Sequence, residues 1–223
     1  MSPAPRIAVI SAVTTAVPPV QAAFAQGMPE AELVNLLDDR LLADAGDGPL
    51  TPELSARMAR LIDHAVLSGA DAVLLSCSFY SAVAADHEPP RAVPVLGPDT
   101  ALFEAAARSA ATRIAVVSSA PGPLEDSISR LRARLGGGPV LIGVLAEGAA
   151  PAARAGDDAA MREAVAAAVR EREAAGGTPP ELVVLGQYSL SPAAGTIDDV
   201  PVLAGPALAV TALREALTSG GAR

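Results

Sequence analysis

Short apolar runs alternate with longer segments whose apolar residues recur at helical spacing. The first half of the chain has four such runs, at Arg6–Ser11, 33–37, Ala72–Leu75 and 93–96. Runs of four to six residues are too short for helices and are typical of parallel strands buried on both faces. The pattern therefore predicts four strands of a parallel sheet in this half.

The segment after the second run carries the signals of a helix start. Thr51 is a capping residue, Pro52 suits the first turn, and Glu53 adds a negative charge there. Apolar residues then recur at helical spacing, at Leu54, Met58, Leu61, Ile62 and Ala65. With further helices predicted near residues 18–26 and 99–110, strands and helices alternate as in an α/β fold.

The second half of the chain repeats the first. RIAVVS at 113–118 repeats RIAVIS at 6–11, ELVVLGQ at 181–187 repeats DAVLLSC at 71–77, and VPVLAG from Val200 repeats VPVLGP from Val93. Three matches in the same order predict an internal duplication.

The duplication predicts two pseudo-symmetric βα domains, each with a four-stranded parallel sheet flanked by helices. We place the first domain at residues 1–98 plus 205–223, with the C-terminal helix, and the second at 99–204. Ligands of such sheets bind just beyond the carboxyl ends of the strands. We therefore expect the active site in the interdomain cleft.

The amino-acid composition excludes several classes of cofactor chemistry and binding partner. All sixteen basic residues are Arg, which excludes a lysine Schiff base with pyridoxal phosphate and a P-loop. A net charge of −9 and only 2% aromatic residues argue against a nucleic-acid partner. A single cysteine permits no intrachain disulfide and suits the cytoplasm, and we find neither a signal peptide nor a membrane span in the sequence.

The single cysteine, Cys77, directly follows the strand-like run Ala72–Leu75 and its next residue, Ser76. A thiol at the carboxyl end of a strand is a candidate nucleophile or acid–base group, and the alternative is a buried structural thiol. His64 is expected on the surface of its helix, whereas His87, in a Pro-rich loop, is a further candidate base. One Cys and two scattered His give no metal-ligand spacing, so no metal site is predicted.

Taken together, these segments resemble the aspartate/glutamate/hydantoin racemase superfamily, which includes arylmalonate decarboxylase and maleate isomerase. The resemblance spans nearly the whole chain and rests on the order of Pro19, Phe24 and Pro29, LDDRLL at 37–42, Ser76-Cys77-Ser78, VPVL at 93–96, GQYSLS at 186–191 and VPVL at 200–203. It implies a cofactor-free enzyme acting on a small carboxylic acid, with homodimers or larger homo-oligomers common in the family.

In two-cysteine members of that superfamily, one thiolate removes the α-proton and a second thiol returns a proton to the opposite face. Cys77 fills the first position, but the second half has no cysteine. Aligning Glu181 with Asp71 makes Gln187 the counterpart of Cys77, which we prefer, and a shift of one residue makes it Gly186. A glutamine amide can donate a hydrogen bond but cannot shuttle a proton.

Several chemistries stay open. Cys77 can serve a racemase or isomerase through an enediolate-like or covalent intermediate, with Tyr188 or water as partner acid. It can instead protonate the enediolate left by decarboxylation of a malonate-type acid. A non-catalytic homologue that only binds carboxylates is the third reading.

The resemblance also implies substrate-binding groups next to the strand ends. These are Thr14, Thr15, Ser78, Phe79, Ser118, Ser119, Gly186, Tyr188 and Ser189. For the Thr and Ser pairs the alternative is helix capping, and Asp38 and Asp39 are expected to fix loops. The side chains of Phe79, Tyr80 and Leu190 favour a substrate less polar than aspartate.

Overall fold

The computed structural model describes residues 4–46, 48–176 and 178–220, so residues 1–3 and 221–223 of the predicted first domain lie outside it. The chain divides into two compact units. Unit 1 comprises Met1–Thr100 and Pro206–Arg223, and unit 2 comprises Ala101–Gly205.

Unit 1 is built on a four-stranded parallel sheet in the order β2-β1-β3-β4. Its strands are β1 (Arg6–Ser11), β2 (Glu32–Leu37), β3 (Ala72–Leu75) and β4 (Val95–Leu96). The inner strands β1 and β3 are buried almost throughout, which explains their unbroken apolar sequence.

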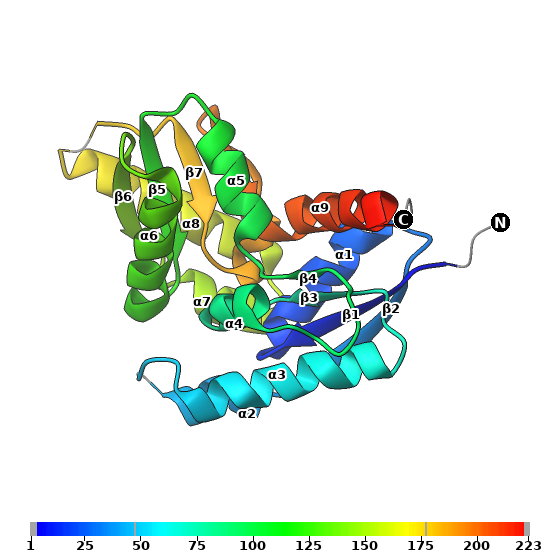
Figure 1. Cartoon of the computed structure of the whole chain (residues 1–223). Coiled ribbons are helices and arrows are strands. Elements are labelled where there is room, and N and C mark those ends of the chain that lie inside the picture. Colours follow the sequence, from blue (N-terminus) through cyan, green and yellow to red (C-terminus); the bar gives the residue numbers. More distant parts are fainter. Residues whose placement is uncertain (1–3, 47, 177, 221–223) are drawn as a thin grey trace. The chain divides into compact units, whose positions relative to one another are not determined.

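Helices cover both faces of this sheet (Figure 1). They are α1 (Val17–Gly27), α2 (Arg40–Ala45), α3 (Pro52–Leu67), α4 (Ser81–Asp86) and α9 (Gly205–Gly220), with 3-10 turns η1 (Thr14–Ala16) and η2 (Ser78–Tyr80). The predicted cap of α3 is present, since Thr51 Oγ1 accepts a hydrogen bond of 3.3 Å from Leu54 N. Met58 and Ile62 of α3 are fully buried in one core cluster with Leu75.

Unit 2 repeats this plan with one addition. Its strands are β5 (Arg113–Ser118), β6 (Val140–Leu145), β7 (Leu182–Leu185), β8 (Gly195–Ile197) and β9 (Val200–Ala204), in the order β6-β5-β7-β9-β8. Its helices are α5 (Thr100–Arg108), α6 (Pro121–Leu135), α7 (Ala149–Ala155) and α8 (Asp158–Ala174), with the 3-10 segment η3 (Tyr188–Ala193). Val165 and Val169 of α8 pack in one buried cluster with Val183 of β7.

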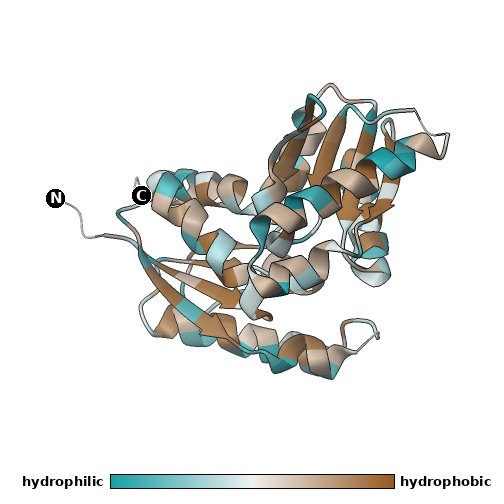
Figure 2. Ribbon diagram, turned by 180° about the vertical axis from the view of Figure 1, so that it is seen from behind, coloured by the Kyte–Doolittle hydropathy of each residue, from teal (hydrophilic) through white to brown (hydrophobic). Residues whose placement is uncertain are grey.

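The predicted α/β class and the four parallel strands of each half are confirmed, and the strand order of unit 1 recurs in unit 2. Figure 2 shows these strands as the most hydrophobic ribbons of the chain. The hydrophobic pattern did not predict β8, which pairs antiparallel with β9. A two-residue turn of Asp198 and Asp199, with φ of 45° and 67°, joins them as in a type I′ hairpin.

The described helices include none that is both long and apolar enough to cross a membrane.

Helix α9 belongs to unit 1 and lies against α1, and this contact can be tested by substitution. A Cβ on Gly27 would lie 2.8 Å from Val210 Cγ1, so Gly27→Ala should destabilise the protein by about 1–3 kcal/mol through overpacking. Val210→Ala makes room for that methyl, so the double variant should lose less stability than the two single losses added together. Urea denaturation of all four proteins measures this coupling, and strictly additive losses would contradict the α1–α9 contact.

Candidate functional site

The carboxyl ends of β1 and β3 are joined at one edge of the unit 1 sheet. Ser76 N donates to Ile10 O at 3.0 Å, and Ser76 Oγ donates to Ser11 Oγ at 2.9 Å, with both serines buried. Cys77 follows in an extended conformation and precedes η2. Cys77 is partly buried and packs against the hydrophobic cluster of unit 1.

Hydroxyl groups follow the same two strands. Thr14 and Thr15 belong to η1 after β1, and Ser78 begins η2 after β3. Neither threonine caps η1 or α1, because the capping residues are Val13 and Ala16. Thr14 is exposed and Thr15 and Ser78 are partly exposed, and their predicted role in substrate binding stays a prediction.

The aromatic pair after Cys77 divides between surface and core. The Phe79 ring is partly exposed and meets the Tyr80 ring edge-on, with centroids 5.1 Å apart. Tyr80 is fully buried and its hydroxyl donates to Leu41 O at 2.9 Å. Burial, with a smaller contribution from nearby Cys77, raises the pKa of Tyr80 to about 12, so its phenol stays neutral at physiological pH.

Asp38 holds a loop after β2, as predicted, and the same expectation for the exposed Asp39 stays a prediction. Both carboxylate oxygens of Asp38 accept from Arg57 of α3, at 2.7 and 2.6 Å. Arg57 also binds Asp44, and these hydrogen bonds raise the pKa of the guanidinium further. Asp38 thus ties the end of β2 to α3.

The two histidines occupy different settings. His64 is exposed, as predicted. His87 Nε2 lies 2.7 Å from Asp63 Oδ1 of α3, so its ring is held by that helix.

In unit 2, Gln187 takes the place that Cys77 has in unit 1. Gly186 N donates to Val117 O at 2.9 Å, the bond that Ser76 N makes to Ile10 O in unit 1. Gln187 then precedes η3, as Cys77 precedes η2. The backbone register therefore pairs Gly186 with Ser76 and Gln187 with Cys77.

The side-chain oxygen of Gln187 is surrounded by donors. Gln187 Oε1 accepts from Ser118 Oγ at 3.0 Å, from Ser119 N at 2.8 Å and from Ser119 Oγ at 2.9 Å. The serines do not cap α6, whose capping residue is Ala120. The structure thus brings together three of the predicted site residues, from two neighbouring strands.

The residues after Gln187 are more buried than the sequence analysis assumed. Tyr188 is 5% exposed and Leu190 is fully buried, whereas Ser189 is partly exposed. Leu190 and Tyr80 belong to the cores of their units. The predicted preference for a less polar substrate is therefore left with Phe79 as its main support.

A buried hydroxyl that the sequence did not predict lies next to Gly186. Ser127 of α6 is fully buried, and its Oγ has no hydrogen-bond partner among the described residues. A Cβ on Gly186 would lie 2.8 Å from this oxygen. The glycine therefore lets α6 approach β7 closely. In the sequence, the buried position of Ser127 is indicated only by its place on the inner face of the helical pattern.

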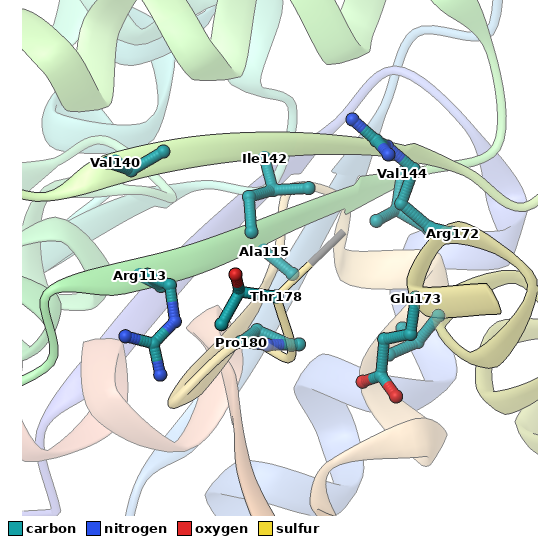
Figure 3. Close-up of a pocket in the computed structure, with 10 residues that line it drawn as sticks. Arg113, Ala115, Val140, Ile142, Val144, Arg172, Glu173, Thr178 and Pro180 are labelled. Atoms are coloured by element: carbon teal, nitrogen blue, oxygen red, sulfur yellow. The ribbon is translucent and has the colours of Figure 1, made fainter. Parts of the chain in front are cut away.

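A hollow of about 300 Å³ in unit 2 has a lining that includes neither Gln187 nor Ser118, Ser119 or Ser127. Figure 3 shows its lining residues. Its lining includes Arg113 and Val140, which begin β5 and β6, and Pro180, which precedes β7. It therefore reaches from the amino ends of β5 and β6 along β6 to Val144, whereas Gln187 follows the carboxyl end of β7. No cluster of three or more His, Cys, Asp or Glu side chains suited to a metal ion occurs in the described ranges.

The fold agrees with a known class of structures. The chain is similar to aspartate racemase from Picrophilus torridus, with a TM-score of 0.73, 10% identity, and 96% and 94% of the two chains covered. It is also similar to glutamate racemase from Francisella tularensis, with a TM-score of 0.72, 14% identity, and coverage of 99% and 83%. It is similar as well to allantoin racemase from Klebsiella pneumoniae, with a TM-score of 0.67, 19% identity, and coverage of 97% and 89%.

These likenesses confirm the predicted fold, which is that of aspartate, glutamate and allantoin racemases. No family model and no curated protein matches the sequence.

The buried phenol of Tyr80 makes the stability of the protein pH-dependent in alkali. Folding raises the Tyr80 pKa from 10.0 to about 12, so the folded state holds the proton more tightly than the unfolded chain. The stabilisation is complete below pH 10 and should fall as the pH rises through 12. Tyr80→Phe should cost about 1–3 kcal/mol at neutral pH, because Leu41 O loses its donor, and should flatten this alkaline decline. Denaturation at a series of pH values measures both effects, and an unchanged alkaline slope in the variant would refute the assignment.

The contact between Ser127 and Gly186 predicts effects of opposite sign. Ser127→Ala removes a buried, unpaired hydroxyl and should stabilise the protein by about 1 kcal/mol or more. Gly186→Ala should destabilise it by about 1–3 kcal/mol, and adding Ser127→Ala should recover part of that loss. Ser129→Ala on the exposed side of α6 is the control for helix propensity. A destabilising Ser127→Ala would show that the hydroxyl has a partner after all.

Proposed function

We propose that the chain is a cofactor-independent racemase or isomerase of a small carboxylic acid, and that Cys77 transfers the proton. The observation that carries the proposal is the place of Cys77 on a racemase fold. The chain's single cysteine stands partly exposed directly beyond an inner strand, where ligands of open α/β sheets bind. Thr14, Thr15 and Ser78 supply donors for the carboxylate at the same sheet edge.

The chemistry follows from the weak acidity of a proton next to a carboxylate. The Cys77 thiolate removes the α-proton and becomes a thiol, and the electron pair moves into the carboxylate to form an enediolate. Hydroxyl and backbone donors stabilise the added negative charge. Return of a proton to the α-carbon restores the acid, with Tyr188 or water as the donor when the opposite face is protonated.

A second candidate is decarboxylation of a malonate-type acid, which the identity of Gln187 favours. Gln187 stands in the position that corresponds to Cys77, and an amide does not exchange protons as a thiol does. Decarboxylation needs a single proton delivery. The substrate loses carbon dioxide, the resulting enediolate takes the proton of Cys77, and solvent reprotonates the thiolate.

Turnover in deuterium oxide distinguishes these functions. Aspartate, glutamate and phenylmalonate are incubated with the protein, and each reaction is followed by NMR and by measurement of optical purity. Deuterium at the α-carbon of recovered acid with loss of optical purity identifies a racemase. Release of carbon dioxide with one deuterium in the product identifies a decarboxylase.

Substitution of the thiol tests the assigned residue. Cys77→Ala should reduce turnover by about 10²- to 10⁴-fold, because the proton-transfer group is lost. Ser129→Ala on the surface of α6 should leave turnover unchanged. Iodoacetamide should inactivate the unsubstituted protein, and an acid that is a substrate should protect Cys77 from alkylation. Full activity of a folded Cys77→Ala protein would overturn the mechanism.

A further inference from the structure

The orientation of the Gln187 side chain is fixed by its neighbours. A backbone N–H can only donate a hydrogen bond, so the atom that lies 2.8 Å from Ser119 N has to be the amide oxygen. The two serine hydroxyls donate to the same oxygen. Three donors on one carbonyl oxygen exceed its two lone pairs, so Oε1 has no capacity left for a ligand.

The nitrogen of the same amide is in the opposite situation. None of the described residues accepts a hydrogen bond from Gln187 Nε2, and this atom is not among the buried polar atoms that lack a partner. The nitrogen is therefore at least partly exposed to solvent, and it carries two N–H groups. The side chain thus presents two donors and no available acceptor.

The serines hold this donor pair rigidly. Ser118 is fully buried at the end of β5, and Gln187 directly follows Gly186 after β7, so both ends of the cluster belong to inner strands. A donor that is already ordered loses little conformational entropy when it binds a ligand.

We infer that Gln187 is a carboxylate-binding residue, with Ser118 and Ser119 as the residues that position its amide. Acceptor-only groups are the chemical match for an exposed donor pair, and a carboxylate is the acceptor-only group of small organic acids. A cation finds no free oxygen there. The inference rests on the proposed function only in taking that carboxylate to be the substrate's own.

Nitrogen-15 NMR observes this amide directly. The chain has three Gln and one Asn, and the other three, Gln21, Gln26 and Asn35, are exposed. Titration with propionate should therefore shift the Gln187 amide pair in a saturable way and leave the other three pairs in place. Gln187→Met should identify the pair by removing it and should abolish the saturable binding. Gln26→Met is the matched control and should bind propionate as the unsubstituted protein does.

Two further variants separate the amide from the hydroxyls that hold it. Gln187→Glu keeps the shape and the acceptor oxygen but adds a negative charge, and should weaken propionate binding at least tenfold. Ser119→Ala removes one of the three bonds to Oε1 and should weaken binding less, while the Gln187 amide signals broaden. Equal binding in the Glu variant, or a propionate shift shared by all four amide pairs, would overturn the inference.

Repeating the titration in Cys77→Ala separates this inference from the proposed function. The variant should bind propionate normally and lack turnover. If it binds propionate and still turns over acids, the assignment of Cys77 fails and that of Gln187 stands. If the variant is inactive but the Gln187 amide pair does not respond to propionate, the assignment of Gln187 fails and that of Cys77 stands.

Discussion

Burial of the inner strands on both faces is the constraint on which each unit depends. β1, β3, β5 and β7 are almost entirely aliphatic, and each is covered by helices above and below. A strand in this setting has no exposed face for a polar side chain, so polar groups can follow only where the strand ends. Ser76, Cys77, Ser118 and Gln187 all stand at such ends. The hydrophobic core therefore decides where chemistry is possible.

The two units use the same edge differently. In unit 1 the buried Ser11 and Ser76 bond to each other, and the following Cys77 remains partly exposed. In unit 2, Gly186 replaces the serine and leaves room for α6, so Ser118 bonds to Gln187 instead. A single change from serine to glycine thus accompanies the change from a thiol to a restrained amide.

Much of this could be read from the sequence, because continuous apolar runs and their repetition depend on local pattern alone. The strands, the cap at Thr51 and the correspondence of Gln187 with Cys77 followed from residue order. The short strand β8 could not be predicted in this way, because it has only three residues and these do not indicate that they pair with β9. Burial of Tyr80 and Leu190 was also missed, because a residue after a strand can turn outward or inward and tertiary packing decides which. The bonds from Ser118 and Ser119 to Gln187 depend on strand pairing across 68 or 69 residues, which no local signal encodes.

The three hydrogen bonds to Gln187 Oε1 bear on the choice between racemisation and decarboxylation. Racemisation has to deliver protons to both faces of the α-carbon, so it needs a second acid besides Cys77. An amide whose oxygen accepts three bonds is stabilised as a neutral hydrogen-bond donor and has no proton to give at neutral pH. The second acid then has to be water or Tyr188, whose side chain is only 5% exposed. Decarboxylation has no such requirement, since carbon dioxide leaves without a base and one thiol completes the product. If Cys77 is the only proton donor, the product of such a reaction carries its new proton on a single face.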